Sequence, residues 1–131
     1  MQWREPIRVF VSTQSAALLV VDDELVAREG LRDFLRAEGF VVHTAENGVD
    51  ALVVFDRHRP ALVITDLEMP QMDGRTLIVE LRKREETPLI LVITAHMSID
   101  AKREAEQLGV DGYVNKPIDL ELMLQCIRAL V

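Results

Sequence analysis

Five short apolar runs alternate with longer segments in which apolar residues recur at helical spacing. The runs cover residues 16–21, 40–44, 62–66, 89–94 and 112–115. Most of them are rich in β-branched residues and too short for an ordinary helix. Apolar runs of this length are typical of strands buried on both faces of a parallel sheet. The pattern therefore predicts five buried strands.

The intervening segments predict five amphipathic helices, at about 24–38, 48–59, 74–84, 98–108 and 119–130. Asn47, Ser98 and Asp119 stand at helix starts, and Asp73-Gly74 marks a turn and a helix start. The residues expected on buried helix faces are Ala27, Leu31, Phe34 and Leu35; Ala51, Leu52 and Phe55; Leu77, Ile78 and Leu81; Ile99, Ala101, Ala105 and Leu108; and Leu122, Met123, Cys126, Ile127 and Leu130. The fourth of these faces relies on alanines, so we expect that helix to be weakly anchored.

A strand followed by a helix, repeated five times, predicts parallel strands joined by right-handed crossovers. The expected fold class is α/β, a doubly wound five-stranded parallel sheet flanked by five helices in a flavodoxin-like three-layer sandwich. The strand order 2-1-3-4-5 is taken from known sheets of this kind and is not dictated by the pattern.

Polar side chains end four of the five strands. Asp22 and Asp23 follow the first strand, Asp66 ends the third, Thr94 ends the fourth and Lys116 follows the fifth. The carboxyl ends of parallel strands share one edge of the sheet, where ligands bind in open α/β folds. With the order 2-1-3-4-5, the three carboxylates meet in one crevice beside the hydroxyl and the lysine.

Three carboxylates in one crevice repel each other unless a cation is present. Oxygen ligands without a Cys or His cluster exclude structural zinc and favour a hard cation such as Mg²⁺, with Mn²⁺ as a substitute. A metal, a free carboxylate, a hydroxyl and a lysine are the parts needed to transfer a phosphoryl group to a carboxylate.

Composition narrows the class of protein. The chain has 131 residues, 49% of them apolar, which is enough for one globular domain. A net charge of −7 without Lys/Arg runs argues against direct binding of this domain to nucleic acid or an anionic membrane. A single cysteine, no leader and no long apolar run favour a soluble cytoplasmic domain.

From about residue 16 to 131, the chain resembles the receiver domain of two-component response regulators. The match is carried by Val21-Asp22-Asp23-Glu24, by Thr65-Asp66-Leu67-Glu68-Met69-Pro70 with Met72-Asp73-Gly74, by Ile93-Thr94-Ala95 and by Tyr113-Val114-Asn115-Lys116-Pro117. Each piece alone is common, but all of them in order, each at a strand end, are very specific. Residues 1–15 are expected to form a loosely ordered extension.

The resemblance implies a role for each matched residue. Asp66 would be the phosphoacceptor, and Asp22, Asp23, Asp66 and the backbone carbonyl of Glu68 would hold Mg²⁺. Lys116 would pair with Asp66 and then with the phosphoryl group. The hydroxyl of Thr94 would move toward a phosphoryl oxygen while the ring of Tyr113 turns inward, although Tyr113 as a half-buried core aromatic is the alternative. The Lys116–Pro117 bond is a candidate cis peptide.

Glu68 and His96 each lie two residues beyond a matched site residue. In the family these positions flank the entrance and tune the lifetime of the phosphoryl group. The alternative, that both side chains only face solvent, stays open at this point.

The resemblance also implies partners. The phosphoryl group would come from a histidine kinase or a phosphotransfer protein, and the fourth helix, fifth strand and fifth helix would report it to a downstream protein or an output domain. The chain ends with the last predicted helix, so a stand-alone receiver and a domain cut from a longer regulator both stay open. A homodimer that forms on phosphorylation is a further expectation.

Three other functions compete. A phosphatase with an aspartate nucleophile needs a second acid two residues on; Glu68 stands there, but Met-Pro follows it and not Gly-Thr. A flavin-binding module needs a Ser/Thr/Gly-rich loop after the first strand, where Asp22-Asp23-Glu24 would repel phosphate. A receiver-like domain without phosphorylation is opposed by the intact set of site residues.

Overall fold

The computed structural model describes residues 16–69, 71–95 and 98–131, and the structural statements below concern these residues. The predicted extension at 1–15, Pro70 and the candidate residue His96 lie outside them.

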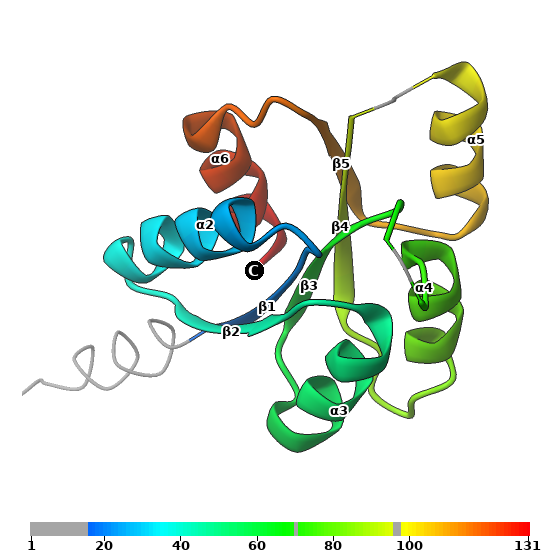
Figure 1. The fold of residues 1–131 in the computed structure, drawn as a ribbon, viewed down its shortest axis with the longest axis horizontal. Helices are drawn as coiled ribbons and strands as arrows, with labels where there is room; N and C mark the ends of the chain where they lie inside the picture. Colours follow the sequence, from blue (N-terminus) through cyan, green and yellow to red (C-terminus); the bar gives the residue numbers. More distant parts are fainter. Residues whose placement is uncertain (1–15, 70, 96–97) are drawn as a thin grey trace, which may run out of the picture.

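Five parallel strands form one sheet in the order β2-β1-β3-β4-β5 (Figure 1). The strands are β1 (Ala17–Val21), β2 (Val41–Ala45), β3 (Leu62–Asp66), β4 (Leu89–Thr94) and β5 (Gly112–Asn115). The doubly wound order 2-1-3-4-5 is therefore confirmed, and it puts the ends of β1 and β3 side by side.

Helices cover both faces of this sheet (Figure 1). They are α2 (Leu25–Ala37), α3 (Gly48–His58), α4 (Gly74–Arg82), α5 (Ile99–Gln107) and α6 (Leu120–Leu130). In Figure 1, α2 and α6 lie on one side of the sheet and α3, α4 and α5 on the other. The predicted three-layer sandwich is thus confirmed.

Side chains of alternate residues in each central strand pack into two separate hydrophobic cores, one on each face of the sheet. In β1, Leu18 and Val20 pack in the core that contains α2 and α6, whereas Leu19 and Val21 pack in the core that contains α3 and α4. All four are at most 1% exposed. Each buried aliphatic side chain of this size contributes about 1.5–3 kcal/mol, so the central strands form a rigid platform for whatever their ends carry.

Side-chain caps begin four of the helices, as the sequence indicates. The side chains of Asn47, Asp73, Ser98 and Asp119 each accept a hydrogen bond from the backbone N–H three residues later. Gly39 follows α2 with φ 99°, a left-handed conformation that favours glycine and stops the helix. Local chemistry therefore sets these boundaries.

Two predicted core residues are exposed. Ile99 is 75% exposed, because a helix turns about 100° per residue and this side chain lies opposite Leu108, the C-cap residue of α5. Leu122 is 50% exposed, and Leu124 is buried in its place beside Met123 and Ile127. Both expectations were wrong: the predicted stripe was too wide on α5, and on α6 it was rotated away from Leu124.

Helix α5 is weakly anchored by apolar contacts. Its one buried residue is Ala105, whereas α6 buries Met123, Leu124 and Ile127. A buried methyl contributes about 0.8 kcal/mol, well below the contribution of a large aliphatic side chain. Polar contacts therefore carry a larger share of the attachment of α5 than of α6.

Over the described ranges, no helix combines the length and the apolar character that crossing a membrane requires.

Candidate functional site

Asp66 ends the central strand β3 with its carboxylate almost fully buried, at 7% exposure. Its Oδ2 lies 2.8 Å from Nζ of Lys116, and its Oδ1 accepts a hydrogen bond of 3.0 Å from the backbone N–H of Glu68. Lys116 comes from the segment after β5 and reaches across β4 to make this contact. Two residues that are 50 positions apart in the chain thus form an ion pair at the carboxyl edge of the sheet.

Asp22 completes this charged group from the end of β1. Its Oδ2 lies 3.5 Å from Nζ of Lys116, and its Oδ1 accepts the backbone N–H of Glu24 at 2.9 Å. Burial raises the pKa of the Asp22 carboxyl, with the charges of Asp66 and Asp23 adding to the shift, and the Glu24 N–H and the Lys116 ammonium offset only part of it. Ionised Asp22 therefore lowers the stability of the metal-free protein.

The ammonium of Lys116 is held in its charged form. Burial by itself would lower its pKa, but the hydrogen bond to Asp66 and the charges of Asp22 and Asp66 outweigh burial and raise it. The single ammonium of Lys116 thus pairs with both Asp22 and Asp66, so these three side chains together carry an excess of negative charge.

The other predicted site residues lie at the same edge. Asp23 is exposed next to buried Asp22. Thr94 ends β4 at 2% exposure, and its carbonyl accepts the backbone N–H of Lys116 at 2.9 Å. Tyr113, on β5, is 36% exposed and has the ammonium of Lys102 5.7 Å from its ring centroid. The Lys116–Pro117 peptide is cis, as expected.

The backbone just after Asp66 is hydrogen-bonded to the first residue of α4. The N–H of Gly74 donates to the carbonyl of Leu67 at 3.0 Å. A Cβ at Gly74 would lie 2.1 Å from the carbonyl oxygen of Asp66, so only glycine allows this approach. The Asp-Gly pair, predicted as a structural turn, therefore also sets the position of the acceptor loop.

The residues present fit a magnesium ion. Within residues 16–69, 71–95 and 98–131, no three His, Cys, Asp or Glu side chains group as a metal site by themselves. Mg²⁺ does not need such a cage, because it commonly takes one or two carboxylates and keeps several waters. Buried Asp22, whose pKa is raised, and Asp66 beside it are oxygen donors that a divalent cation would stabilise.

Three contacts of the site were not found by sequence reasoning. Arg28, on the first turn of α2, donates from Nη1 to the carbonyl of Asp22 at 2.8 Å. Thr65 donates from Oγ1 to the carbonyl of Asp66 at 2.9 Å. The third is the ion pairing of Glu68 with Arg75. Helical or strand periodicity carries no signal for such contacts, since each depends on the local backbone conformation at a strand end or loop and on side-chain rotamers.

Replacement of Asp22 by Asn should stabilise the metal-free protein near neutral pH and raise its melting temperature. Because the folded pKa lies above the ordinary value of 3.8, the penalty for ionised Asp22 is present at high pH and disappears as pH falls toward 3.8. Thermal unfolding as a function of pH measures this gain. A gain that grows on acidification would contradict the assignment, and Mg²⁺ should narrow the difference from the unsubstituted protein.

Known proteins resemble this chain in sequence over most of its length. Residues 18–128 match the family model described as the response regulator receiver domain. Transcriptional regulatory protein GlrR of Escherichia coli is 40% identical over 119 residues, which cover 89% of this chain and 26% of that protein. Response regulator MprA of a Mycobacterium species is 39% identical over 114 residues, covering 87% of this chain and 50% of that protein.

A solved structure is also similar. The chemotaxis response regulator CheY4 of Vibrio cholerae superposes with a TM-score of 0.82 at 29% identity, covering 89% of this chain and 99% of that one. The chain spans half or less of the length of the two curated relatives above. Because the family model matches residues 18–128, which are most of this chain, the chain belongs to the response regulator receiver domains, the phosphoacceptor switches of two-component signal transduction.

Proposed function

We propose that Asp66 is the residue that accepts the phosphoryl group, within a receiver domain formed by residues 16–131. The observation that carries this assignment is the buried ion pair of Asp66 with Lys116, at 2.8 Å, at the end of the central strand. A rigid strand holds the carboxylate, and a cation lies where negative charge would develop.

The donor would be a phosphohistidine of a histidine kinase or phosphotransfer protein, or a small phosphodonor. An oxygen of Asp66 attacks phosphorus, the bond from phosphorus to the donor nitrogen breaks, and the leaving imidazole takes up a proton. Both carboxylate oxygens already accept one hydrogen bond, and each keeps a lone pair for the attack. Positioning and charge supply most of the catalysis in such transfers.

Asp22, Asp23, Asp66 and the backbone carbonyl of Glu68 would hold Mg²⁺, which supplies positive charge against the transferring phosphoryl oxygens. Mn²⁺ has similar ligand preferences and would substitute. The exposure of Asp23 and the burial of Asp22 support a division of labour, with Asp23 as the direct ligand and Asp22 shaping the water shell of the metal.

Lys116 and Thr94 would act on the phosphoryl group after transfer. The ammonium of Lys116 exchanges its contact with Asp66 for one with a phosphoryl oxygen, and the Thr94 hydroxyl donates to another. The backbone hydrogen bond between Lys116 and Thr94 supports their joint action. Tyr113 would turn inward as Thr94 moves. Its side chain is exposed on the edge strand β5, so the ring has room to turn.

The output would pass through α5, β5 and α6 to a partner protein or an output domain. Exposed Tyr113, Leu120 and Leu122 lie along this surface, and a groove of about 320 Å³ runs beside Tyr113, Pro117 and Leu122. A phosphorylation-dependent homodimer would use the same apolar surface. Glu68, and His96 outside the described residues, would tune how long the phosphoryl group survives.

The test is metal-dependent phosphorylation. The protein should incorporate phosphate from a small phosphodonor when Mg²⁺ is present, lose this ability in a chelator, and regain it on addition of Mg²⁺ or Mn²⁺. Phosphate incorporation that is unchanged by the chelator would overturn the metal assignment. No incorporation with either metal would overturn the function.

A further inference from the structure

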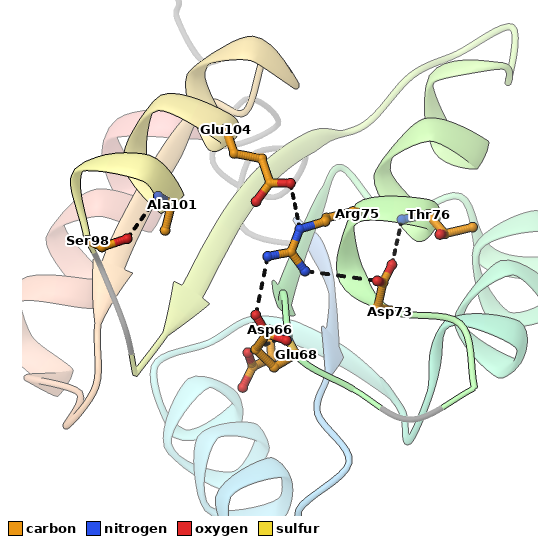
Figure 2. Close-up of polar contacts among 8 residues, drawn as sticks. All are labelled: Asp66, Glu68, Asp73, Arg75, Thr76, Ser98, Ala101 and Glu104. Carbon is orange, nitrogen blue, oxygen red and sulfur yellow. Dashed lines mark hydrogen bonds and ion pairs between the residues drawn. The ribbon is translucent and has the colours of Figure 1, made fainter.

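Arg75, on the first turn of α4, contacts carboxylates from three parts of the chain (Figure 2). Its Nε lies 2.6 Å from Oε2 of Glu104 on α5, and its Nη2 lies 3.2 Å from Oε1 of Glu68 in the loop after β3. Its Nη1 lies 3.9 Å from Oδ2 of Asp73, the N-cap of α4. Figure 2 shows the guanidinium between Glu104 on one side and Glu68 and Asp73 on the other.

This arrangement depends on one forked cation. A guanidinium has five N–H donors in a fixed plane, so it can bind carboxylates on separate edges at once, whereas a lysine ammonium is a single point of charge. Three carboxylates around one guanidinium leave an excess of negative charge. Any weakening of one ion pair therefore strengthens the remaining ones, because the acids share one positive charge and repel one another.

The same group connects the acceptor to a helix. The backbone N–H of Glu68 donates to Oδ1 of Asp66, while the side chain of Glu68 pairs with Arg75. Arg75 in turn pairs with Glu104 on α5. A short chain of direct contacts thus runs from the candidate phosphoacceptor to α5.

Helix α5 has few other anchors. Ala105 is its one buried residue, and Ile99 at its start is 75% exposed. The side chains of Arg75 and Glu104 are only 33% and 37% exposed, so water screens their ion pair less than a fully solvated one. The contact with Arg75 is therefore well placed to hold α5 near the acceptor loop.

We propose that Arg75 is a positioning residue that couples the place of α5 to the lifetime of the phosphoryl group on Asp66. The inference rests on Asp66 being the phosphoacceptor. While α5 is docked, Glu104 and Glu68 share the guanidinium. When α5 moves away, Arg75 binds Glu68 more strongly, and the charge beside the phosphoryl group changes.

The step that this charge affects is hydrolysis of the aspartyl phosphate. A water oxygen bonds to phosphorus and the bond from phosphorus to the Asp66 oxygen breaks. The carboxylate of Asp66 is restored, and dihydrogen phosphate leaves with both protons of the water and then equilibrates with solvent. The backbone N–H of Glu68 donates to Oδ1 of Asp66, which fixes residue 68 next to the reacting group, so the degree to which Arg75 neutralises the Glu68 side chain should alter the rate.

A double-mutant cycle tests the coupling. Proteins carrying Glu68→Gln, Glu104→Gln and both substitutions are phosphorylated with a small phosphodonor and Mg²⁺, the donor is removed, and the decay of the phosphoprotein is followed. Glu68→Gln should change the decay rate without abolishing phosphorylation. Glu104→Gln should shift it about two- to fivefold, the range of coupling for partly exposed ion pairs, although Glu104 lies on another helix.

The two effects should not multiply in the presence of Arg75, because both acids act through one guanidinium. In an Arg75→Gln background they should become independent. The matched control is Glu106→Gln, which removes the same charge from an exposed position of α5 and should leave the decay unchanged. Equal decay rates for Glu104→Gln and Glu106→Gln, or independent effects while Arg75 is present, would overturn the proposal.

Hydrogen exchange gives a readout that does not require phosphorylation. In the unphosphorylated protein, Arg75→Gln should speed amide exchange in α5 and leave α6 unchanged. Unchanged exchange in α5, in a protein that still takes up phosphate, would overturn this inference and leave the proposed function intact. Failure of the unsubstituted protein to take up phosphate would overturn both.

Discussion

Replacement of Asp66 by Asn should abolish uptake of phosphate, reducing it by at least about a thousandfold, as expected when a nucleophile is removed. The amide has nearly the same shape but lacks the charge and the free carboxylate oxygen that attack phosphorus. Lys116 keeps a carboxylate partner in Asp22, 3.5 Å away, so the fold should be retained. Incorporation of phosphate from a small phosphodonor in Mg²⁺ measures the effect.

Asp73→Asn is the matched control for this experiment. It makes the same chemical change in the same loop, and Asn caps helices as well as Asp does, so the hydrogen bond to the N–H of Thr76 is kept. This protein should be phosphorylated normally. Undiminished uptake in Asp66→Asn would refute Asp66 as the acceptor, whereas equal loss of uptake in Asp73→Asn would show that the loss is not specific to position 66.

Replacement of Gly74 by Ala should damage both stability and phosphorylation. The new Cβ would lie 2.1 Å from the carbonyl oxygen of Asp66 and 2.7 Å from Cα of Leu67, and backbone atoms cannot rotate away as a flexible side chain can. We expect a loss of about 1–3 kcal/mol in the free energy of unfolding, as for other overpacked sites. Displacement of the acceptor loop should slow phosphate uptake on the order of a hundredfold.

Gly30→Ala separates this steric effect from the general effect of removing a glycine. A Cβ at Gly30, on α2, would meet no heavy atom within 4 Å. The substitution should therefore stabilise the protein by about 0.5–1 kcal/mol, since alanine favours the helix. Denaturant unfolding of the two variants compares them directly. Similar stability for both would mean that the backbone at Gly74 has more room than the structure indicates.

The positions of the acceptor and its lysine could be predicted because they follow from the sheet. Buried apolar runs that end on Asp22, Asp66 and Thr94 put polar groups at one edge of parallel strands, and this edge is what the structure contains. The order of the strands was not predictable from the pattern alone. It was taken from known doubly wound sheets, and the observed order β2-β1-β3-β4-β5 confirms it.

The contacts of long charged side chains could not be predicted. Arg75 and Glu104 are 29 positions apart and meet only because α4 and α5 pack on the same side of the sheet. Nor could the sequence decide whether the Glu68 side chain merely faces solvent. In the structure it is exposed and also paired with Arg75, and its role in tuning the phosphoryl lifetime stays a prediction.

Reduction of the phosphorylated protein with borohydride tests the central assignment most directly. Borohydride converts an aspartyl phosphate to homoserine, and peptide mapping then identifies the position that carried it. We expect conversion at Asp66 and no conversion at Asp22, Asp23 or Asp73. Homoserine at any of those three positions, or none at Asp66 in a protein that has taken up phosphate, would contradict it.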